Sequence, residues 1–280
     1  MAVCWGGTWP AGKLAVEEVP PAVLATVRFA LSSAMLWIWT RALAKPLPRP
    51  TRSDLPLVLA LGLTAVAGYN LLFLYGLTLA PASDGAIIVP GLAPLMTVLL
   101  AVPVLGERIG RRAALGLLTA IVGLVLVVDP GGGVDSDRVV GDLLFLGGAL
   151  VWGVYSVIGK HATSRFGPVG ATLYATAVGT AMLVPFSFLD GGWSELAEAD
   201  PDAWVSIAYL AVFGTVVGFV LFYEGVRRIG PSRATSFTLL VPVFGVLSSV
   251  LILGEELGLS TVAGGLIVLT GLWLVQRRRS

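Results

Sequence analysis

Ten apolar stretches, most of them about 20 residues long, run through this chain of 280 residues. They lie at roughly 1–16, 22–43, 55–79, 83–104, 110–128, 140–161, 168–189, 203–226, 232–253 and 259–276. A helix that crosses a bilayer needs about 20 largely apolar residues, because each backbone amide must find its partner within the segment. Only 12% of the residues are charged, roughly half the fraction in a typical soluble domain. The sequence therefore predicts an all-α membrane protein with ten transmembrane helices, surrounded by the lipid bilayer.

Basic residues gather on one side of this predicted membrane protein. When successive breaks between the stretches are assigned to alternate sides, one side receives 15 of the 18 Lys and Arg residues. The other side receives 14 of the 17 acidic residues. Loops rich in Lys and Arg stay in the cytoplasm, and ten spans return the chain to its starting side. The pattern predicts a multi-pass protein of the cell (inner) membrane with both termini cytoplasmic.

Two similar phrases occur once in each half of the chain. "CWGGTWPAGK" at 4–13 and "VWGVYSVIGK" at 151–160 share a Trp-Gly and a Gly-Lys pair at an offset of 147 residues. Pro94 and Pro242 each stand 12 residues before a Gly-Glu pair, at an offset of 148. Spans one to five therefore match spans six to ten, which divides the chain into units 1–133 and 139–280.

The odd number of spans in each unit determines the relation between the two units. Because five spans carry the chain across the membrane, the second unit enters from the opposite side. The fold expected is two inverted five-helix repeats, an arrangement that secondary transporters use to open a central site to each side in turn. Such symmetry also occurs in channels, so fold alone does not decide the function.

Longer motifs carry a family resemblance. "GVRRIGPSRATSFTLLVPVFGVLSSVLILGEEL" at 225–257 and "LAPASDGAIIVPGLAPLMTVLLAVPVLGER" at 79–108 resemble the signatures of the drug/metabolite transporter superfamily, EamA-type. The resemblance covers almost the whole chain and implies ten helices in two inverted repeats and export or exchange of small metabolites such as amino acids. Many relatives place an acid just before the proline of span nine, where this chain has Val241. That departure leaves open whether a proton or a counter-substrate is the coupled partner.

Ionisable residues inside the predicted spans are candidates for function, because a charge in the membrane is costly. Arg28 either reaches outward or binds backbone carbonyls at a helix break, or its planar guanidinium holds a substrate carboxylate. Lys13 and Lys160 occupy matching places in the repeat and are interface anchors or parts of a gate. Glu224 either pairs with Arg227 and Arg228 one turn later or serves as a gate carboxylate.

Aromatic and polar residues on repeat-matched helices are candidates to line a substrate cavity. With Arg28, they are Trp5, Trp9, Tyr69, Asn70, Trp152, Tyr155 and Ser156. Proline within a helix removes a backbone hydrogen bond and bends the helix. Pro90, Pro94 and Pro242 are therefore candidates either for hinges of alternating access or for fixed bends.

These patterns favour a secondary transporter, an exporter of a small amino-acid-like metabolite that works by alternating access. The chain has no Gly-x-x-x-x-Gly-Lys-Ser/Thr phosphate loop, so no ATP-driven step is expected. One Cys, one His and a net charge of +1 predict no metal site, no cofactor, no nucleic-acid partner and no enzyme activity. The alternatives are a small-multidrug-type exporter, a lipid-linked-solute flippase, a pore and a membrane scaffold without transport.

Overall fold

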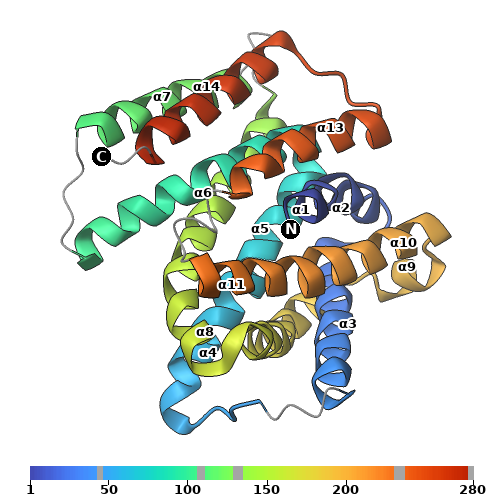
Figure 1. The fold of residues 1–280 in the computed structure, drawn as a ribbon. Helices are drawn as coiled ribbons and strands as arrows, with labels where there is room; N and C mark the ends of the chain where they lie inside the picture. The colour runs from blue at the N-terminus through green and yellow to red at the C-terminus, as the bar shows by residue number, and fades with distance from the viewer. Residues whose placement is uncertain (43–46, 106–110, 129–134, 230–236, 277–280) are drawn as a thin grey trace.

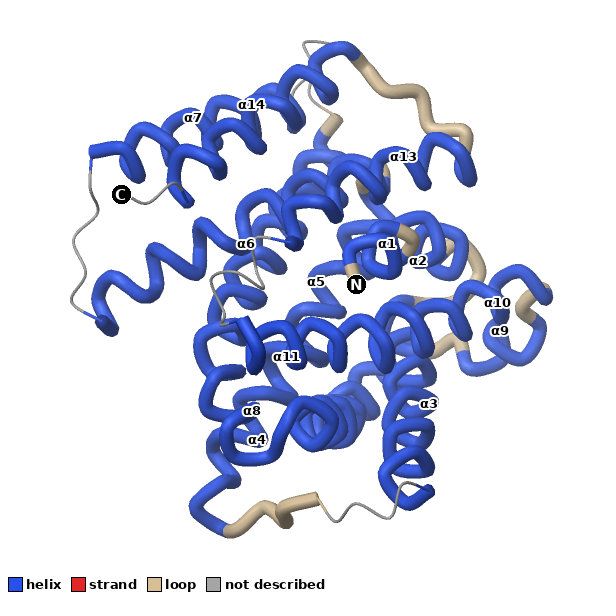
Figure 2. The backbone as a smooth tube through the Cα atoms, in the orientation of Figure 1, coloured by secondary structure: helices blue, strands red, loops and turns tan. Residues whose placement is uncertain are grey.

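A computed structural model describes residues 1–42, 47–105, 111–128, 135–229 and 237–276. Every secondary-structure element in these ranges is a helix, and the helices form one bundle (Figures 1 and 2). The predicted all-α class is confirmed for this part of the chain.

The first half contributes nine helical elements to the described structure. They are α1 (Ala2–Gly6), α2 (Thr8–Val16), α3 (Pro21–Ala42), η1 (Arg52–Asp54), α4 (Leu55–Leu61), η2 (Gly62–Gly68), α5 (Tyr69–Leu79), α6 (Ala82–Leu105) and α7 (Arg111–Val128). The element η1 is a 3₁₀ turn, and η2 is a π-helical segment that joins α4 to α5 in one long stretch.

The second half repeats this pattern in part. Its elements are α8 (Ser136–Asp190), α9 (Trp193–Glu198), α10 (Pro201–Tyr209), η3 (Leu210–Val217), α11 (Gly218–Ile229), η4 (Phe237–Leu240), α13 (Val241–Leu253) and α14 (Leu259–Gln276). The element η3 is again π-helical and joins α10 to α11, and η4 is a 3₁₀ turn before α13.

Two boundaries differ from those expected. The first predicted span is divided at Gly7 into α1 and α2. Conversely, α8 covers two predicted spans and is divided only at Gly167, which has φ 71° and ψ 171°. Glycine adopts this positive φ without steric cost, and Pro168 disfavours a helical conformation at the residue before it. The break therefore takes one residue, with no loop.

Four described stretches are long and apolar enough to cross a membrane. They are Pro21–Ala42, Arg52–Leu79, Ser136–Asp190 and Pro201–Gly225, and shorter apolar helices lie at Ala82–Ala93, Val241–Leu253 and Leu259–Gly271. The outside of the bundle is apolar as well: Trp37 is 53% exposed, Leu251 74% and Leu259 90%. A surface this apolar suits hydrocarbon better than water. The protein is a multi-pass membrane protein, and the count of ten helices stays a prediction.

Glycine allows close helix contacts inside the bundle. The helices α7 and α14 lie side by side (Figure 1), and a Cβ atom at Gly123 would lie 2.6 Å from the carbonyl oxygen of Gly264. A Cβ at Gly271 would lie 2.5 Å from the carbonyl oxygen of Gly116. Small residues at such crossings let two backbones approach in a lipid environment, which accounts for part of the high glycine content.

Candidate functional site

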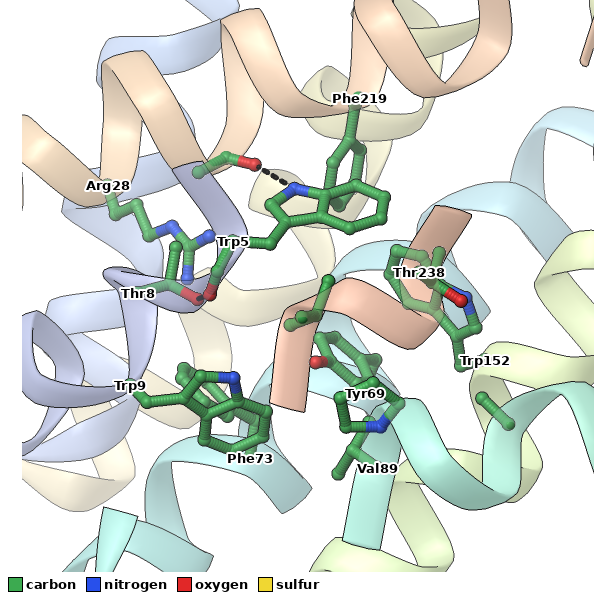
Figure 3. Close-up of a pocket in the computed structure, with 14 residues that line it drawn as sticks. Trp5, Thr8, Trp9, Arg28, Tyr69, Phe73, Val89, Trp152, Phe219 and Thr238 are labelled. Carbon is green, nitrogen blue, oxygen red and sulfur yellow. Dashed lines mark hydrogen bonds between the residues drawn. The ribbon is translucent and has the colours of Figure 1, made fainter. Parts of the chain in front are cut away.

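A cavity of about 50 Å³ lies between the two halves of the chain. Figure 3 shows side chains from both halves pointing toward it. Its lining residues are Trp5, Thr8, Trp9, Arg28, Tyr69, Phe73, Val89, Pro90, Ala93, Trp152, Gly214, Phe219, Thr238 and Val241. Arg28 is the one ionisable cation among them, so the cavity walls carry one formal positive charge.

Six of the fourteen lining residues are aromatic. Trp5 and Trp152, which are equivalent in the sequence repeat, meet edge to face with ring centroids 5.3 Å apart and planes at 88°. Trp9 meets Phe73 at 4.9 Å and 78°, and Tyr69 lies 5.0 Å from Trp152. Edge-to-face contacts of this kind are favourable beyond the area they bury. The repeat thus brings its two matching tryptophans together at the cavity.

The two π-helical segments shape the polar part of the site. In a π-helical turn the backbone bonds span five residues instead of four, which leaves carbonyl oxygens available to other donors. Trp5 Nε1 donates to the carbonyl oxygen of Gly214 in η3 at 3.0 Å, the hydrogen bond drawn in Figure 3. Ser32 Oγ donates to the carbonyl oxygen of Ala211 at 3.2 Å. The carbonyl oxygens of η3 therefore accept hydrogen bonds from side chains of α1 and α3.

Arg28 lies at the centre of this polar region and is only 4% exposed. Its Nε donates to the carbonyl oxygen of Leu210 in η3 at 3.2 Å, and its Nη1 donates to Asn70 Oδ1 at 3.1 Å. Asn70 Nδ2 in turn donates to the carbonyl oxygens of Ala65 and Val66 in η2, at 3.1 and 3.0 Å. Arg28 and Asn70 thus connect the two π-helical segments. The expectation that Arg28 binds a backbone carbonyl at a helix irregularity matches this geometry.

Part of the guanidinium is still available to a ligand. Within the described part of the chain, Nη2 donates no hydrogen bond. It lies against Gly214, where a Cβ atom would be 3.0 Å from it. Because Gly214 has no side chain, Nη2 can approach it this closely. Arg28 lines the cavity, and a guanidinium N–H without an acceptor suits a carboxylate.

The structure places the other predicted cavity residues as follows. Trp5, Trp9, Tyr69 and Trp152 line the cavity, as does Arg28. Asn70 lies behind Arg28 and reaches the cavity only through it.

Two predicted residues lie farther back, beyond Trp152. Tyr155 is fully buried, with its ring 5.1 Å from that of Trp152. Ser156 Oγ donates to the carbonyl oxygen of Trp152 at 2.9 Å. Neither of these two side chains lines the cavity.

Several lining residues were not among those predicted from the sequence. Phe73 lies one turn after Tyr69 on α5, and helical spacing from Tyr69 identifies it. Phe219 follows η3 directly. Val241 also lines the cavity, so the position at which many relatives carry an acid is here an apolar wall.

The three gate candidates occupy different settings. Lys13 Nζ donates to the carbonyl oxygens of Leu77 and Ala80 at 2.7 and 3.5 Å. These bonds provide donors for carbonyl oxygens at the C-terminal end of α5. Lys160 is exposed. Glu224 makes both expected ion pairs, with Arg227 at 2.6 Å and Arg228 at 2.5 Å.

The proline candidates also differ from one another. Pro90 lies within α6 and lines the cavity. The expectation that Pro242 lies inside a helix is wrong, because it is the second residue of α13. At that position its missing N–H removes no helical hydrogen bond. Pro94 lies in α6, and its side chain is outside the described residues.

The pattern of the EamA-like transporter family matches the chain twice, over residues 1–129 and 139–277. The chain belongs to the EamA-like transporter family. Over 275 residues it is 30% identical to an "Uncharacterized transporter" of Archaeoglobus fulgidus, covering 98% of this chain and 95% of that one. Over 273 residues it is 28% identical to the "Uncharacterized transporter YyaM" of Bacillus subtilis, covering 95% and 88% of the two chains.

Two further comparisons add detail. The chain is 28% identical over 276 residues to a "Probable terminal-alkyne amino-acid exporter" of Streptantibioticus cattleyicolor, covering 99% and 91% of the two chains. A solved crystal structure superposes with a TM-score of 0.66 at 21% identity and covers 98% of this chain and 94% of the other. At that identity the superposition supports the fold alone. The family and the names of the relatives identify a membrane transporter.

Proposed function

We propose that the protein is a secondary transporter that exports a small amino-acid-like metabolite across the bacterial inner membrane by alternating access. In this proposal ten helices form two inverted five-helix repeats, with both termini in the cytoplasm. The observation that carries the proposal is the cavity between the halves, with aromatic walls, one buried guanidinium and two repeat-related tryptophans in contact.

The chemistry of the cavity favours a solute with both an acidic and an apolar part. The Nη2 edge of Arg28 suits a carboxylate, and the walls of Trp5, Trp9, Phe73 and Trp152 suit an apolar or aromatic side group. One relative is named as a probable amino-acid exporter, which agrees with this class.

The size of the cavity favours a closed state. Its volume of about 50 Å³ is well below the roughly 300–1,000 Å³ of ordinary small-molecule sites. A metabolite therefore enters only when the halves separate, as alternating access requires. Pro90 and Pro94 on α6 are proposed bending points. Lys13 and Lys160 are proposed to contribute to the gates, whereas the ion pairs of Glu224 with Arg227 and Arg228 are proposed to be structural.

The function is tested with purified protein in liposomes loaded with candidate metabolites, with and without a pH gradient. Saturable counter-flow of one solute supports a carrier and names its substrate. Flux without saturation or counter-flow supports a pore, and movement of labelled lipid-linked solutes supports a flippase. Folded protein that moves no solute but retains a protein partner supports a scaffold. Each of these last three outcomes contradicts the proposal.

The inverted topology has its own test. With Cys4 replaced by Ser, single cysteines at Arg49 and Glu195, both exposed, are labelled with a membrane-impermeant reagent in intact cells. Glu195→Cys is expected to react from outside and Arg49→Cys only after the cells are opened. The reverse result contradicts the proposed orientation.

A further inference from the structure

The outer end of the proposed bundle contains a group of charges that the cavity does not use. Asp84 lies in the first turn of α6 and is fully buried. Arg138 lies in the first turn of α8, and its Nε donates to Asp84 Oδ2 at 2.8 Å. The side chain of Arg138 is 23% exposed and that of Asp84 is 1% exposed. This ion pair joins the first half of the chain to the second.

A second carboxyl group, that of Asp142, lies one helical turn after Arg138 on α8. It is only 3% exposed, and neither of its oxygens has a hydrogen-bond partner within the described residues. Asp84 Oδ1 is likewise buried without a partner there. Asp84 and Arg138 are the charged groups that act on Asp142 electrostatically.

Close packing keeps Asp142 away from other donors. A Cβ at the preceding Gly141 would lie 2.6 Å from Ala80 Cβ, at the end of α5. One turn later, the ring of Phe145 lies against Gly85 of α6, where a Cβ would be 2.8 Å from it. The carboxyl group of Asp142 therefore sits between three helices and faces no solvent.

Other charges nearby already have partners. Lys13 on α2 is bonded to carbonyl oxygens at the end of α5. Glu255, from the loop between α13 and α14, accepts from the backbone N–H groups of Ala82 and Ser83 at 2.9 and 3.1 Å. It thereby caps the N-terminus of α6, where a negative charge is favourable. Glu256 lines the neighbouring cavity.

The net charge of Asp84, Arg138 and Asp142 indicates which ligand this group binds. Ionised Asp84 and Arg138 balance each other, so an ionised Asp142 leaves one buried negative charge without a donor. Such a charge costs several kcal/mol or more in a protein interior. The described residues contain no group of three or more metal-ligating side chains, which disfavours a metal ion as the counter-charge. One proton restores neutrality.

We propose that Asp142 is a proton-binding site, with Asp84 and Arg138 as the pair that sets its charge balance. The proton comes from the outer solution and converts the Asp142 carboxylate into a carboxylic acid, with no other bond made or broken. A cavity of about 380 Å³ is lined by Asp84 and Arg138 but not by Asp142, so in this proposal the proton passes the ion pair before it reaches Asp142. The role as the coupling site rests on the proposed transport function, and it supplies an acid that position 241 lacks.

Infrared difference spectroscopy between neutral and alkaline pH, on the full-length protein in vesicles of an ether-linked phosphatidylcholine that has no ester carbonyl band, tests the site without any solute. Wild type is expected to show the C=O stretch of one buried carboxylic acid at neutral pH, which disappears on alkalinisation. Asp142→Asn removes this band, whereas Asp137→Asn, at an exposed position five residues earlier, keeps it. Asp84→Asn is also expected to remove the band, because Asp142 then becomes the ionised partner of Arg138.

The contrary outcomes are equally specific. A wild-type spectrum without a carboxylic-acid band at neutral pH overturns the proposal even if the variants do not fold. A band that persists in folded Asp142→Asn also overturns it. In the same vesicles, counter-flow of a solute reports separately on transport. A carboxylic-acid band without any solute movement supports the proton site and contradicts the transporter, and counter-flow without the band does the reverse.

If a solute is found, a coupling role makes one further demand. In wild type, a pH gradient is expected to stimulate net flux of the solute at least tenfold. Asp142→Asn is expected to keep counter-flow of the solute and to lose this stimulation. Unchanged stimulation in this variant contradicts the coupling role.

Discussion

The segments η2 and η3 occupy equivalent places in the two halves, since Gly62 and Leu210, where they begin, lie 148 residues apart. Both are π-helical, yet their released carbonyl oxygens serve different partners. Those of η2 accept from Asn70, two residues beyond the end of the same segment. Those of η3 accept from Arg28, Ser32 and Trp5 of the other half. The same backbone irregularity is used locally in one half and to join the halves in the other.

The two segments carry different residues at the same place. The fifth residue of η2 is Val66, and the fifth residue of η3 is Gly214. In the first half the space lies on the neighbouring helix, because Gly179 of α8 gives room to Val66. In the second half the space lies on the segment itself, because Gly214 lets Thr8 and Arg28 approach. Two similar halves thus produce one polar site instead of two.

The largest effect is expected from Arg28→Leu. This variant leaves Asn70 Oδ1 without its donor, leaves the carbonyl oxygen of Leu210 with Thr215 Oγ1 as its one side-chain donor among the described residues, and removes the proposed carboxylate contact. Hydrogen bonds from a charged group contribute about 1.5–3 kcal/mol, so the initial rate of solute counter-flow should fall by about tenfold to a hundredfold. Arg28→Lys keeps the charge without the planar fork, so its counter-flow rate should lie between the rates of wild type and Arg28→Leu. A wild-type rate in folded Arg28→Leu contradicts a role in binding.

Gly179→Ala tests the contact of η2 with α8. The new Cβ would lie 2.3 Å from Val66 Cβ, and overpacking of this kind costs about 1–3 kcal/mol of unfolding free energy. The matched control on the same helix is Gly147→Ala, whose Cβ would lie 3.4 Å from the nearest atom, in Leu72. Thermal unfolding in detergent should show a lower midpoint for the first variant only. Equal midpoints contradict a close contact at η2.

A smaller difference is expected between the two repeat-related tryptophans. Trp5→Phe removes the donor to the carbonyl oxygen of Gly214 and should cost about 1 kcal/mol. For Trp152 no hydrogen bond from the indole is present among the described residues, so Trp152→Phe should cost less. Unfolding midpoints of the two variants measure the difference. A larger loss of stability in Trp152→Phe than in Trp5→Phe contradicts the claim that only the Trp5 indole contributes a hydrogen bond between the halves.

The smallest effect is expected at Glu224→Gln. Its ion pairs with Arg227 and Arg228 are largely solvent-exposed, and exposed pairs contribute little. Stability and counter-flow should stay within error of wild type. A marked loss of counter-flow at unchanged stability would instead assign Glu224 to a gate.

Hydropathy and residue spacing predict the all-α class and five of the cavity residues, and the resemblance of the longer motifs predicts the family. These properties depend on apolar length and on side chains that recur at matching places, both of which are visible in one dimension. The π-helical segments are not predictable in this way. Their sequences, "GLTAVAG" and "LAVFGTVV", differ from ordinary membrane helix only in having small residues, and tertiary packing decides the backbone.

The acidic pair shows a second limit. In the sequence, Asp84 and Asp142 belong to the acidic residues near the outer ends of spans, and they have no local signal of burial. Only the packing of α5, α6 and α8 removes them from solvent. Pro242 shows the same limit for a boundary, because the sequence does not reveal that a 3₁₀ turn precedes α13.

The distance along the chain between Arg28 and Leu210 bears on biosynthesis. They are 182 residues apart, so a ribosome must make most of the protein before the guanidinium meets that carbonyl oxygen. An arginine in hydrocarbon without such a partner is costly. The nascent amino-terminal half should therefore stay at the insertion machinery or the headgroup layer until the later helices arrive, and on its own it should be a poor folding unit.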